Sequence, residues 1–496
     1  MRNNRSPLNL SVPLALALVM LTLSGCSTNP ATGSQSFTAF MSGEDEARIG
    51  AEEHPKMLKE FGGRYEARAL EAYVRHIGKK LAAVSEMPDI PWRFTVLNDP
   101  QVNAFALPGG YVYVTRGLLV LAQNEAELAS VLAHEIGHVT ARHTAQRYST
   151  AMATNIGLTG LGILGGVFGV PTGVGQIIST GAQMAIQKYS QGQEMEADLL
   201  GVRYMSRASY DPNAVTTFLR KLRAHHNLEA RQKGKEGVPH NIMSTHPRNE
   251  DRVKQAMDLA RIKAVPRPIV NADVFLDRID GMVFGDDSKQ GVVRGRDFLH
   301  PELRVMFSVP KGFIIFNSRR KVVAFGPNKS RIIFDMASRK QAKTVRNLAA
   351  YLKGVWASNL NVRNIERLEI NGLRAATGHG RTSVSGQPRE VRLIVIRESR
   401  EHIYRLAFFT PPSEAQRLNV ELRRATYSFR RLTQAEADAI KPLRLEVREA
   451  RAGDTVANLA QHFPIERFQR EWFRLLNNMK VGQRINLGQR LKLVTE

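Results

Sequence analysis

Two histidines one helical turn apart are the feature that most constrains this chain. They lie in the stretch LASVLAHEIGHVTARH, where His134, Glu135 and His138 form the pattern His-Glu-x-x-His. Residues four apart share one face of an α-helix, so the two imidazoles can bind a single tetrahedral zinc ion. Glu135 is turned by about 100° from His134, so it can face a water molecule at the metal without being a ligand. The alternative is a core helix whose two histidines are hydrogen-bonded.

The residues around this motif predict a buried helix. Asn124 can cap the helix, and Glu127 three residues later completes a capping-box pattern. An apolar stripe at helical spacing would bury one face, and it consists of Leu128, Val131, Leu132, Ile136 and Val139. These signals predict the helix independently of the metal motif.

A catalytic zinc site needs a third protein ligand and an open position. The candidate is the stretch YSQGQEMEADLLG, in which Ser190 and Gln193 form a cap pair that begins a second helix. Glu194 and Asp198 share one face of this helix, whereas Glu196 is about 200° away from each. We therefore expect Glu194 to bind the metal and Asp198 to orient a ligating imidazole, with Glu196 as the alternative ligand. A solvated acidic face is the competing interpretation.

Three motifs in this order resemble the M48 family of zinc endopeptidases. They are HEIGH, the E-x-E-A-D of residues 194–198, and Ser244-Thr245-His246-Pro247. The resemblance covers about residues 30–263. It implies a mainly helical, gluzincin-type metalloprotease domain with a small edge-strand sheet and one zinc ion. The zinc ligands that it implies are His134, His138 and Glu194.

The resemblance also implies roles for the other polar residues of these motifs. Glu135 would be the catalytic base, and Asp198 would support His134. His246 would stabilise the oxyanion or gate access to the metal. Arg252, six residues after His246, matches a recurrent arginine of that loop and is counted among the residues that bind substrate.

A predicted hairpin precedes the motif helix, in the stretch NAFALPGGYVYVTRGLL. Asn103, Ala104, Phe105 and Ala106 look like the edge strand that holds a peptide substrate in extended form through backbone pairing. The turn at Gly109-Gly110 would then return the chain toward the helix. The alternative is an ordinary hairpin in front of a helix.

The N-terminus has the form of a secretory signal. A short basic region, MRNNR, is followed by an apolar run that ends at Cys26. The residues Leu23-Ser24-Gly25-Cys26 resemble a bacterial lipobox, which implies removal of residues 1–25 and lipidation of Cys26, the only cysteine of the chain. Ser27 in the next position favours, by the same analogy, the outer membrane. A transmembrane anchor is the alternative, although the apolar core is short for a span of about 20 residues.

The formal net charge of +24 indicates attraction to polyanions. Such partners are nucleic acid, anionic lipid head groups and acidic cell-wall polymers. A secreted and lipidated chain meets lipid and wall polymers but no nucleic acid. We therefore expect a lipoprotein of the outer membrane that faces the periplasm, with peptidoglycan as a further partner.

An uncharged segment extends from Tyr148 to Gln187. Its nine glycines and Pro171 predict against a continuous helix in water. We interpret the segment as a packed, partly flexible hairpin or lid beside the site. The alternative is a segment that dips into the membrane.

Sequence patterning divides the chain after the signal into four parts. A polar tether over residues 26–43 leads to the protease domain over residues 44–265, where helical patterning dominates. Strand-like runs over residues 270–435 predict an α+β domain, in which the basic stretch Arg319–Lys353 is interpreted as a solvated face. Residues 443–496 resemble a degenerate LysM module of βααβ order, and LysM modules generally bind peptidoglycan or chitin sugars. The fold class of the whole chain is α+β.

Three functions are compatible with these features. The first is a lipid-anchored zinc endopeptidase that degrades unfolded or misassembled envelope proteins, because backbone pairing recognises extended conformation more than sequence. The second is a non-enzymatic chaperone or peptidoglycan-bound scaffold with a latent metal site, in which His246 fills the open position. A peptidoglycan amidase ranks last, because zinc amidases usually lack this HExxH and ExxxD arrangement.

Overall fold

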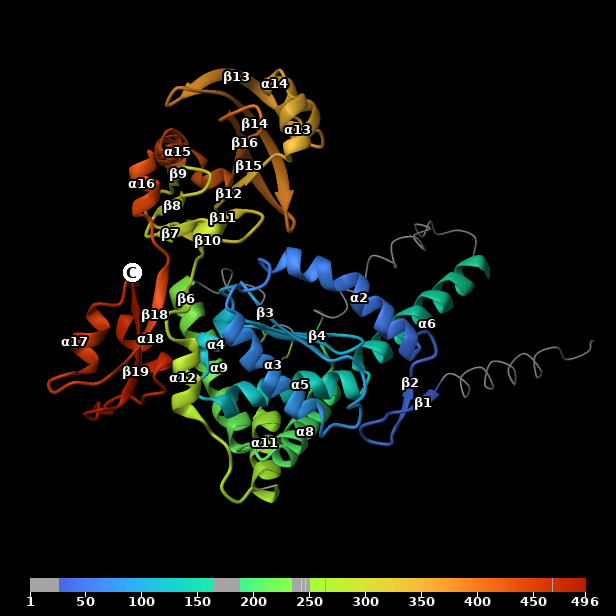
Figure 1. Cartoon of the computed structure of the whole chain (residues 1–496). Coiled ribbons are helices and arrows are strands. Elements are labelled where there is room, and N and C mark those ends of the chain that lie inside the picture. The colour runs from blue at the N-terminus through green and yellow to red at the C-terminus, as the bar shows by residue number, and fades with distance from the viewer. Residues whose placement is uncertain are drawn as a thin grey trace, which may run out of the picture. The chain divides into compact units, whose positions relative to one another are not determined.

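The chain forms two compact units, whose elements are labelled in Figure 1. The computed structural model describes residues 26–164, 188–233, 242, 246, 250–263, 265–465 and 467–496. The predicted signal peptide and residues 165–187 of the uncharged segment lie outside the described residues. The first unit contains the chain up to residue 226 with residues 239–280 and 475–481, and the second contains residues 227–238, 281–474 and 482–496.

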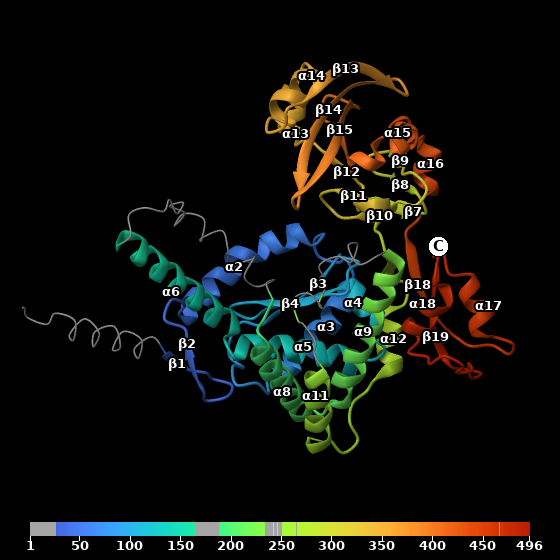
Figure 2. The same ribbon diagram turned by 180° about the vertical axis from the view of Figure 1, so that it is seen from behind.

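Helices make up most of the first unit, as its predicted fold class requires. Their bounds are α2 (Gly43–Glu60), α3 (Arg68–Ala82), α4 (Arg116–Leu121), α5 (Glu125–Thr140), α6 (His143–Leu164), α8 (Gln191–Arg207), α9 (Asn213–Lys233), α11 (Glu250–Ile262) and α12 (Ala272–Ile279). Helix α8 packs against α5 and α11 (Figure 2). Helix α12 packs against α3 and α5, so residues 272–279 belong to this unit and not to the domain that we expected to begin at residue 270.

A three-stranded sheet lies beside α5 in the order β3-β5-β4. Strands β3 (Arg93–Leu97) and β5 (Tyr111–Thr115) are parallel, whereas β4 (Ala104–Leu107) and β5 are antiparallel. Gly109 and Gly110 form the turn with φ angles of 77° and 85°, a backbone region that favours glycine. Strand β4 is therefore an edge strand of this sheet, as the predicted hairpin requires.

The segment after Cys26 is more ordered than the expected tether. Strands β1 (Cys26–Thr28) and β2 (Gln35–Phe37) pair antiparallel and form what we call the N-terminal hairpin, residues 26–37. Arg203 on α8 donates a hydrogen bond to Ala31 O at 3.0 Å, and Gln146 on α6 donates one to Ser36 Oγ at 3.2 Å. The polar composition of this segment predicted a tether. Composition does not reveal hydrogen bonds to residues far along the chain, such as those to Arg203 and Gln146.

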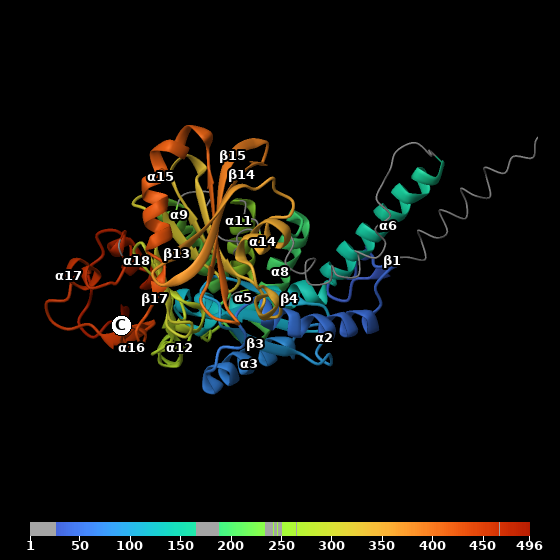
Figure 3. The ribbon, with the colours of Figure 1, turned by 90° about the horizontal axis from the view of Figure 1, so that it is seen from above.

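Helix α6 corrects the interpretation of the first part of the uncharged segment. Its glycines predicted against a helix, yet α6 continues from His143 to Leu164. Figure 3 shows the far end of α6 extending away from α5 and α8. None of the helices in the described residues is both long and apolar enough to cross a membrane. The lid and the membrane-dipping interpretations of residues 165–187 stay predictions.

Antiparallel sheets dominate the second unit, in agreement with the expected α+β class. The seven-stranded sheet has the order β10-β11-β12-β16-β15-β14-β13, and its strands are β10 (Ile314–Asn317), β11 (Val322–Phe325), β12 (Arg331–Met336), β13 (Arg363–Ile370), β14 (Leu373–Val384), β15 (Gln387–Arg397) and β16 (Ile403–Thr410). The four-stranded sheet has the order β17-β9-β8-β7, and its strands are β7 (Val292–Arg294), β8 (Asp297–His300), β9 (Val305–Ser308) and β17 (Arg430–Arg431).

Four α-helices of the described residues accompany these two sheets, and the basic stretch is exposed. The helices are α13 (Arg339–Thr344), α14 (Leu348–Tyr351), α15 (Pro412–Tyr427) and α16 (Gln434–Ala439). Every Lys and Arg between Arg319 and Lys353 is exposed except the half-buried Arg331. This exposure supports the interpretation of that stretch as a solvated basic face.

The C-terminal residues have the predicted strand–helix–helix–strand order. The elements are β18 (Leu443–Glu449), α17 (Val456–Gln461), α18 (Gln469–Leu476) and β19 (Arg490–Thr495). Strand β18 pairs with β19, and β6 (Val283–Phe284) adds a third strand that the sequence did not predict. Sugar binding by this module stays a prediction.

Candidate metal centre

Helix α5 carries the two motif histidines inside the first unit. The Asn124 side chain accepts a hydrogen bond from Glu127 N at 2.8 Å and so caps the helix as predicted. The Glu127 carboxylate, however, accepts from Gln123 N at 2.7 Å, one residue before the position that a capping box would use. Lys221 on α9 lies 2.9 Å from the same carboxylate, so Glu127 also ties α5 to α9.

Helix α8 approaches α5 closely enough to bring its first turn against the motif. A complete capping box between Ser190 and Gln193 begins α8, as predicted. A Cβ atom on Gly137 of α5 would lie 3.1 Å from Ala197 O, and one on Gly201 of α8 would lie 3.3 Å from His134 N. These two glycines therefore permit the short distance between the helices.

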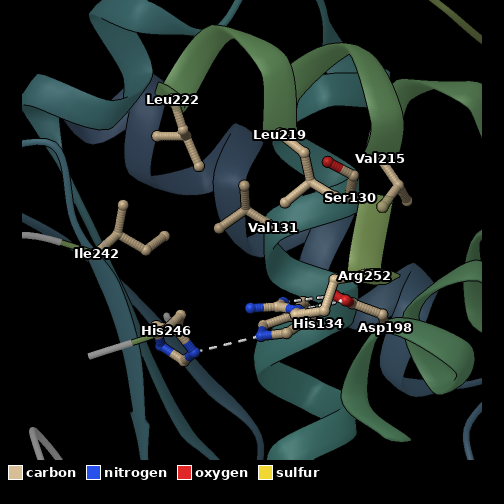
Figure 4. Close-up of a pocket in the computed structure, with 10 residues that line it drawn as sticks. All are labelled: Ser130, Val131, His134, Asp198, Val215, Leu219, Leu222, Ile242, His246 and Arg252. Atoms are coloured by element: carbon tan, nitrogen blue, oxygen red, sulfur yellow. Dashed lines mark hydrogen bonds and ion pairs between the residues drawn. The ribbon is translucent and has the colours of Figure 1, made fainter. Parts of the chain in front are cut away.

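Four side chains converge where the two helices meet, and Figure 4 shows the imidazole of His246 directed toward that of His134. His134 Nε2 lies 3.1 Å from His138 Nε2 and 3.3 Å from His246 Nδ1. Glu194 Oε1 lies 2.8 Å from His246 Nδ1 and 3.5 Å from His138 Nε2. One donor atom from each residue lies within 4.8 Å of the other three. We call these four residues the donor cluster.

The donor cluster fits a zinc ion. A tetrahedral zinc site with bonds of about 2.1 Å to nitrogen or oxygen has ligands about 3.4 Å apart. The distances from 2.8 to 3.6 Å among the donor atoms span this value. Three imidazoles and one carboxylate are also ligand types that zinc prefers. The arrangement includes His246, which the sequence reasoning assigned to the oxyanion or to a gate.

The protonation states of two cluster residues favour metal binding. Burial lowers the pKa of His138 well below its ordinary value, so this ring is neutral. Burial alone would raise the pKa of Glu194, but the charge of His246 and hydrogen bonds from His138 and His246 hold it well below its ordinary value. Burial opposes a charge on His246 as well, yet the carboxylates of Glu194 and Glu135 raise its pKa. A raised pKa makes it less favourable for His246 to lose the proton that metal binding displaces.

Glu135 lies beside the donor cluster and is completely buried. Neither of its carboxylate oxygens accepts a hydrogen bond within the part of the chain that the structure describes, and His246 Nε2 lies 3.5 Å from Oε1. Burial raises the pKa of Glu135. A buried carboxylate without donors is costly, so this position suits a group that exchanges a proton with a bound molecule.

Asp198 lies against the imidazole of His134, and Arg252 lies against Asp198. Asp198 Oδ1 lies 2.9 Å from His134 Nδ1, the ring nitrogen that faces away from the cluster. Arg252 is 2% exposed and pairs with both carboxylates of α8, at 2.7 Å from Asp198 Oδ2 and 2.5 Å from Glu194 Oε2. Its expected contact with substrate stays a prediction.

Glu196 points away from the donor cluster, as the helical spacing predicted, and reaches a histidine that the sequence reasoning missed. His143 is the first residue of α6, three residues after α5 ends at Thr140, and its Nδ1 is 2.8 Å from His138 Nδ1. His143 Nε2 is 3.1 Å from Glu196 Oε2. Tyr189, also missed, stacks on His138 with ring centroids 3.7 Å apart. The third histidine of HEIGHVTARH was the available sequence signal for this contact.

The predicted substrate strand has one unpaired edge. Thr115 N donates to Asn103 O at 3.0 Å. The backbone groups of Asn103 and, two residues later, Phe105 are therefore directed toward β5. The backbone groups of Ala104 and Ala106 therefore face the other edge, because pairing alternates along an antiparallel strand. No described strand pairs with β4 on that side. The side chains of these four residues are buried.

An apolar hollow adjoins His134 and His246 (Figure 4). Its apolar lining comes from α5, α9 and residue 242, and consists of Val131, Val215, Leu219, Leu222 and Ile242. Such a lining next to a metal centre can accept an apolar side chain of a bound peptide.

Comparison with known proteins shows that the region around this centre is similar to a family of peptidases. Residues 68–260 match the model of Peptidase family M48. This match begins at α3 and so covers less than the residues 30–263 over which the motifs suggested a resemblance.

Several relatives match the same region. A β-barrel assembly-enhancing protease of Yersinia pestis is 34% identical over 228 residues, which cover 44% of this chain and 45% of that protein. The mitochondrial metalloendopeptidase OMA1 of Schizosaccharomyces pombe is 32% identical over 218 residues, 42% of this chain and 59% of that protein. The chain thus spans about half the length of these relatives. The match to Peptidase family M48 covers residues 68–260, which include all four residues of the donor cluster.

Proposed function

We propose that this chain is a zinc-dependent endopeptidase of the bacterial cell envelope that degrades unfolded or misassembled envelope proteins. The observation that carries the proposal is the donor cluster with the buried carboxylate of Glu135 beside it, to which no described residue donates a hydrogen bond. The similarity to a β-barrel assembly-enhancing protease and to a mitochondrial metalloendopeptidase supports this class of substrate.

His134, His138 and Glu194 would hold the metal, and His246 would be its fourth donor in the described arrangement. Bound zinc supplies Lewis-acid chemistry, which polarises a carbonyl and lowers the pKa of water. Glu135 takes a proton from the attacking water at a carboxylate oxygen and passes it to the leaving amine. Its raised pKa suits this task, because the carboxyl must both accept and release a proton.

His246 has two uses in this proposal. As a fourth donor it fills the position that a catalytic zinc site must keep open. When it leaves that position, its imidazole stays near the reacting atoms and donates a hydrogen bond to the oxyanion. The raised pKa of His246 favours the donating form.

Substrate recognition in this proposal depends on β4 and on the apolar hollow. The outward backbone groups of Ala104 and Ala106 pair with an extended peptide, which selects for unfolded chains more than for sequence. The hollow lined by Val131, Leu219 and Leu222 accepts one apolar side chain of that peptide. Misassembled envelope proteins expose both extended backbone and apolar side chains.

The main test is the variant Glu135→Gln. We expect it to hold one zinc per chain, as the wild type does, and to lose cleavage of an unfolded envelope β-barrel protein by about 100-fold or more. The matched control is Glu53→Gln, which changes another buried glutamate outside the donor cluster and should leave cleavage unchanged. Undiminished cleavage by Glu135→Gln would contradict the mechanism.

Attachment to the outer membrane is part of the proposal and rests on the lipobox-like residues that end at Cys26. Cells given a labelled fatty acid should incorporate it into the wild-type chain and not into Cys26→Ser. Equal incorporation by the two chains would show that the lipid is elsewhere and would contradict the role of Cys26.

A non-enzymatic chaperone or scaffold with a latent metal site is the second candidate. The position of His246 favours it, because four protein donors leave a zinc ion without an open position. A wild-type chain that holds zinc, binds unfolded β-barrel proteins and does not cut them would support this candidate over the endopeptidase.

A further inference from the structure

A chain of hydrogen bonds leads from the donor cluster to the N-terminal hairpin. It begins at His138 Nδ1, which lies 2.8 Å from His143 Nδ1, and continues from His143 Nε2 to Glu196 Oε2 at 3.1 Å. The other oxygen of Glu196 accepts from Asn29 Nδ2 at 2.9 Å and from Thr32 Oγ1 at 3.0 Å. The chain therefore connects three segments that are distant in sequence.

The direction of each hydrogen bond follows from the ligand atom of His138. Its Nε2 faces the donor cluster, at 3.1 Å from His134 Nε2, so this nitrogen must be without hydrogen when it binds metal. His138 Nδ1 then carries the hydrogen and donates it to His143 Nδ1. His143 in turn carries its hydrogen on Nε2 and donates it to Glu196. Glu196 thereby selects the tautomer of both rings.

We propose that His143 and Glu196 are positioning residues for the ligand His138, and that Asn29 and Thr32 of the N-terminal hairpin complete this support. The inference rests on the proposed zinc site. The two motif histidines then have different supports. His134 Nδ1 lies 2.9 Å from a carboxylate, that of Asp198. His138 reaches its carboxylate only through the second ring of His143.

The N-terminal hairpin is held in place by bonds that do not involve Glu196. Arg203 donates to Ala31 O at 3.0 Å, Gln146 donates to Ser36 Oγ at 3.2 Å, and Arg142 donates to Met41 O just beyond the hairpin at 2.8 Å. Asn29 is 2% exposed and His143 is completely buried. The hairpin is therefore a fixed part of the first unit and presents Asn29 to Glu196 in a defined orientation.

The experiment measures zinc affinity of the full chain by competition with a chromophoric chelator. Loss of a residue that orients a metal ligand typically lowers metal affinity 10- to 100-fold. We expect a loss of about tenfold or more for His143→Leu, which removes both hydrogen bonds. His143→Asn keeps an acceptor near the former Nδ1 and should recover part of the affinity. Wild-type affinity in a folded His143→Leu would overturn the inference.

A double-mutant cycle separates the chain of hydrogen bonds from a merely structural effect. Glu196 is partly exposed, so Glu196→Gln should fold normally, and we expect it to weaken zinc binding about threefold or more. In the His143→Leu background the same change should have no further effect, because the link to His138 is already absent. Additive losses would show that the two residues act separately and would overturn the relay.

The hairpin has its own variant and control. Asn29→Ala removes a donor to Glu196 and should weaken zinc binding, whereas Gln35→Ala removes an exposed bond to Thr28 within the hairpin and should leave the affinity unchanged. Equal affinities for these two variants would exclude the hairpin from the support of His138. A wild-type chain that binds no zinc would instead contradict the proposed function itself.

Discussion

The guanidinium of Arg252 binds the carboxylate of Asp198 at two points inside the protein. Arg252 Nε donates to Oδ2 at 2.7 Å and Nη2 donates to Oδ1 at 2.9 Å. Asp198 Oδ1 also lies 2.9 Å from His134 Nδ1. Arg252 therefore fixes the carboxylate that orients the imidazole of His134. This pair joins α11 to α8 and thereby ties the donor cluster to a helix that carries none of its ligands.

Arg252→Met should destabilise the first unit by about 3 kcal/mol or more, because it leaves two buried carboxylates without their cation. The measurement is urea unfolding in the presence of a chelator, followed by circular dichroism at a wavelength where helices dominate. Arg252→Lys keeps the charge but loses the two-point geometry, so its effect should be intermediate. An Arg252→Met variant as stable as the wild type would contradict the role of this pair.

Ala106→Pro should reduce cleavage of unfolded substrates about tenfold or more while zinc content stays at the wild-type value. Proline removes the outward N–H of Ala106, which would pair with a peptide, and leaves the bonds between β4 and β5 in place. Ala106→Ser keeps this N–H and is the control. If both variants cleave equally well, substrate does not pair with this edge of β4.

Leu219→Asp should lower kcat/KM for a peptide with leucine next to the cleaved bond by about tenfold or more, because the apolar hollow would then contain a charge. Val420→Asp, at an exposed apolar position of the second unit, is the control and should have no effect. An undiminished kcat/KM in Leu219→Asp would show that the substrate side chain binds elsewhere.

Glu46 should make stability depend on pH. Burial raises its pKa to about 7, against the charge of Arg142, whose Nε donates to Glu46 at 3.2 Å. The folded state therefore binds a proton more tightly than the unfolded state, whose glutamate pKa is near its ordinary value. The contribution of Glu46 to stability is complete below about pH 4.5 and is lost as the pH rises through about 7.

Glu46→Gln tests this dependence. The difference in melting temperature between wild type and variant should favour the wild type increasingly as the pH falls from 8 to 5. Thermal unfolding of the two chains in matched buffers measures this difference. A difference that is constant across this range would show that the pKa of Glu46 is not raised.

Local spacing in the sequence predicted most of the donor cluster. His134 and His138 share a helical face because they are four residues apart, and Glu194 and Asp198 do so for the same reason. The caps at Asn124 and Ser190 are also local hydrogen bonds, so they too could be predicted. The strand–helix–helix–strand order of the C-terminal residues followed from patterning of the same kind.

Contacts between distant segments could not be predicted in this way. The motif resemblance assigned Arg252 to substrate binding, and nothing in it predicted the contacts with Asp198 and Glu194 that follow from the packing of α11 on α8. Composition predicted a tether where the N-terminal hairpin docks on α6 and α8. Glycine content predicted against the helix that α6 forms.

The sequence is enough to identify His134, His138 and Glu194 as possible zinc ligands, because helical periodicity places residues i and i+4 on one face whatever the rest of the chain does. The residues that surround these ligands depend on the tertiary structure. His246 lies 112 residues after His134, and Asn29 lies 167 residues before Glu196, yet the two residues of each pair are in direct contact. Residues this far apart in sequence come together only when the core packs, because no local rule relates the orientations of such distant segments.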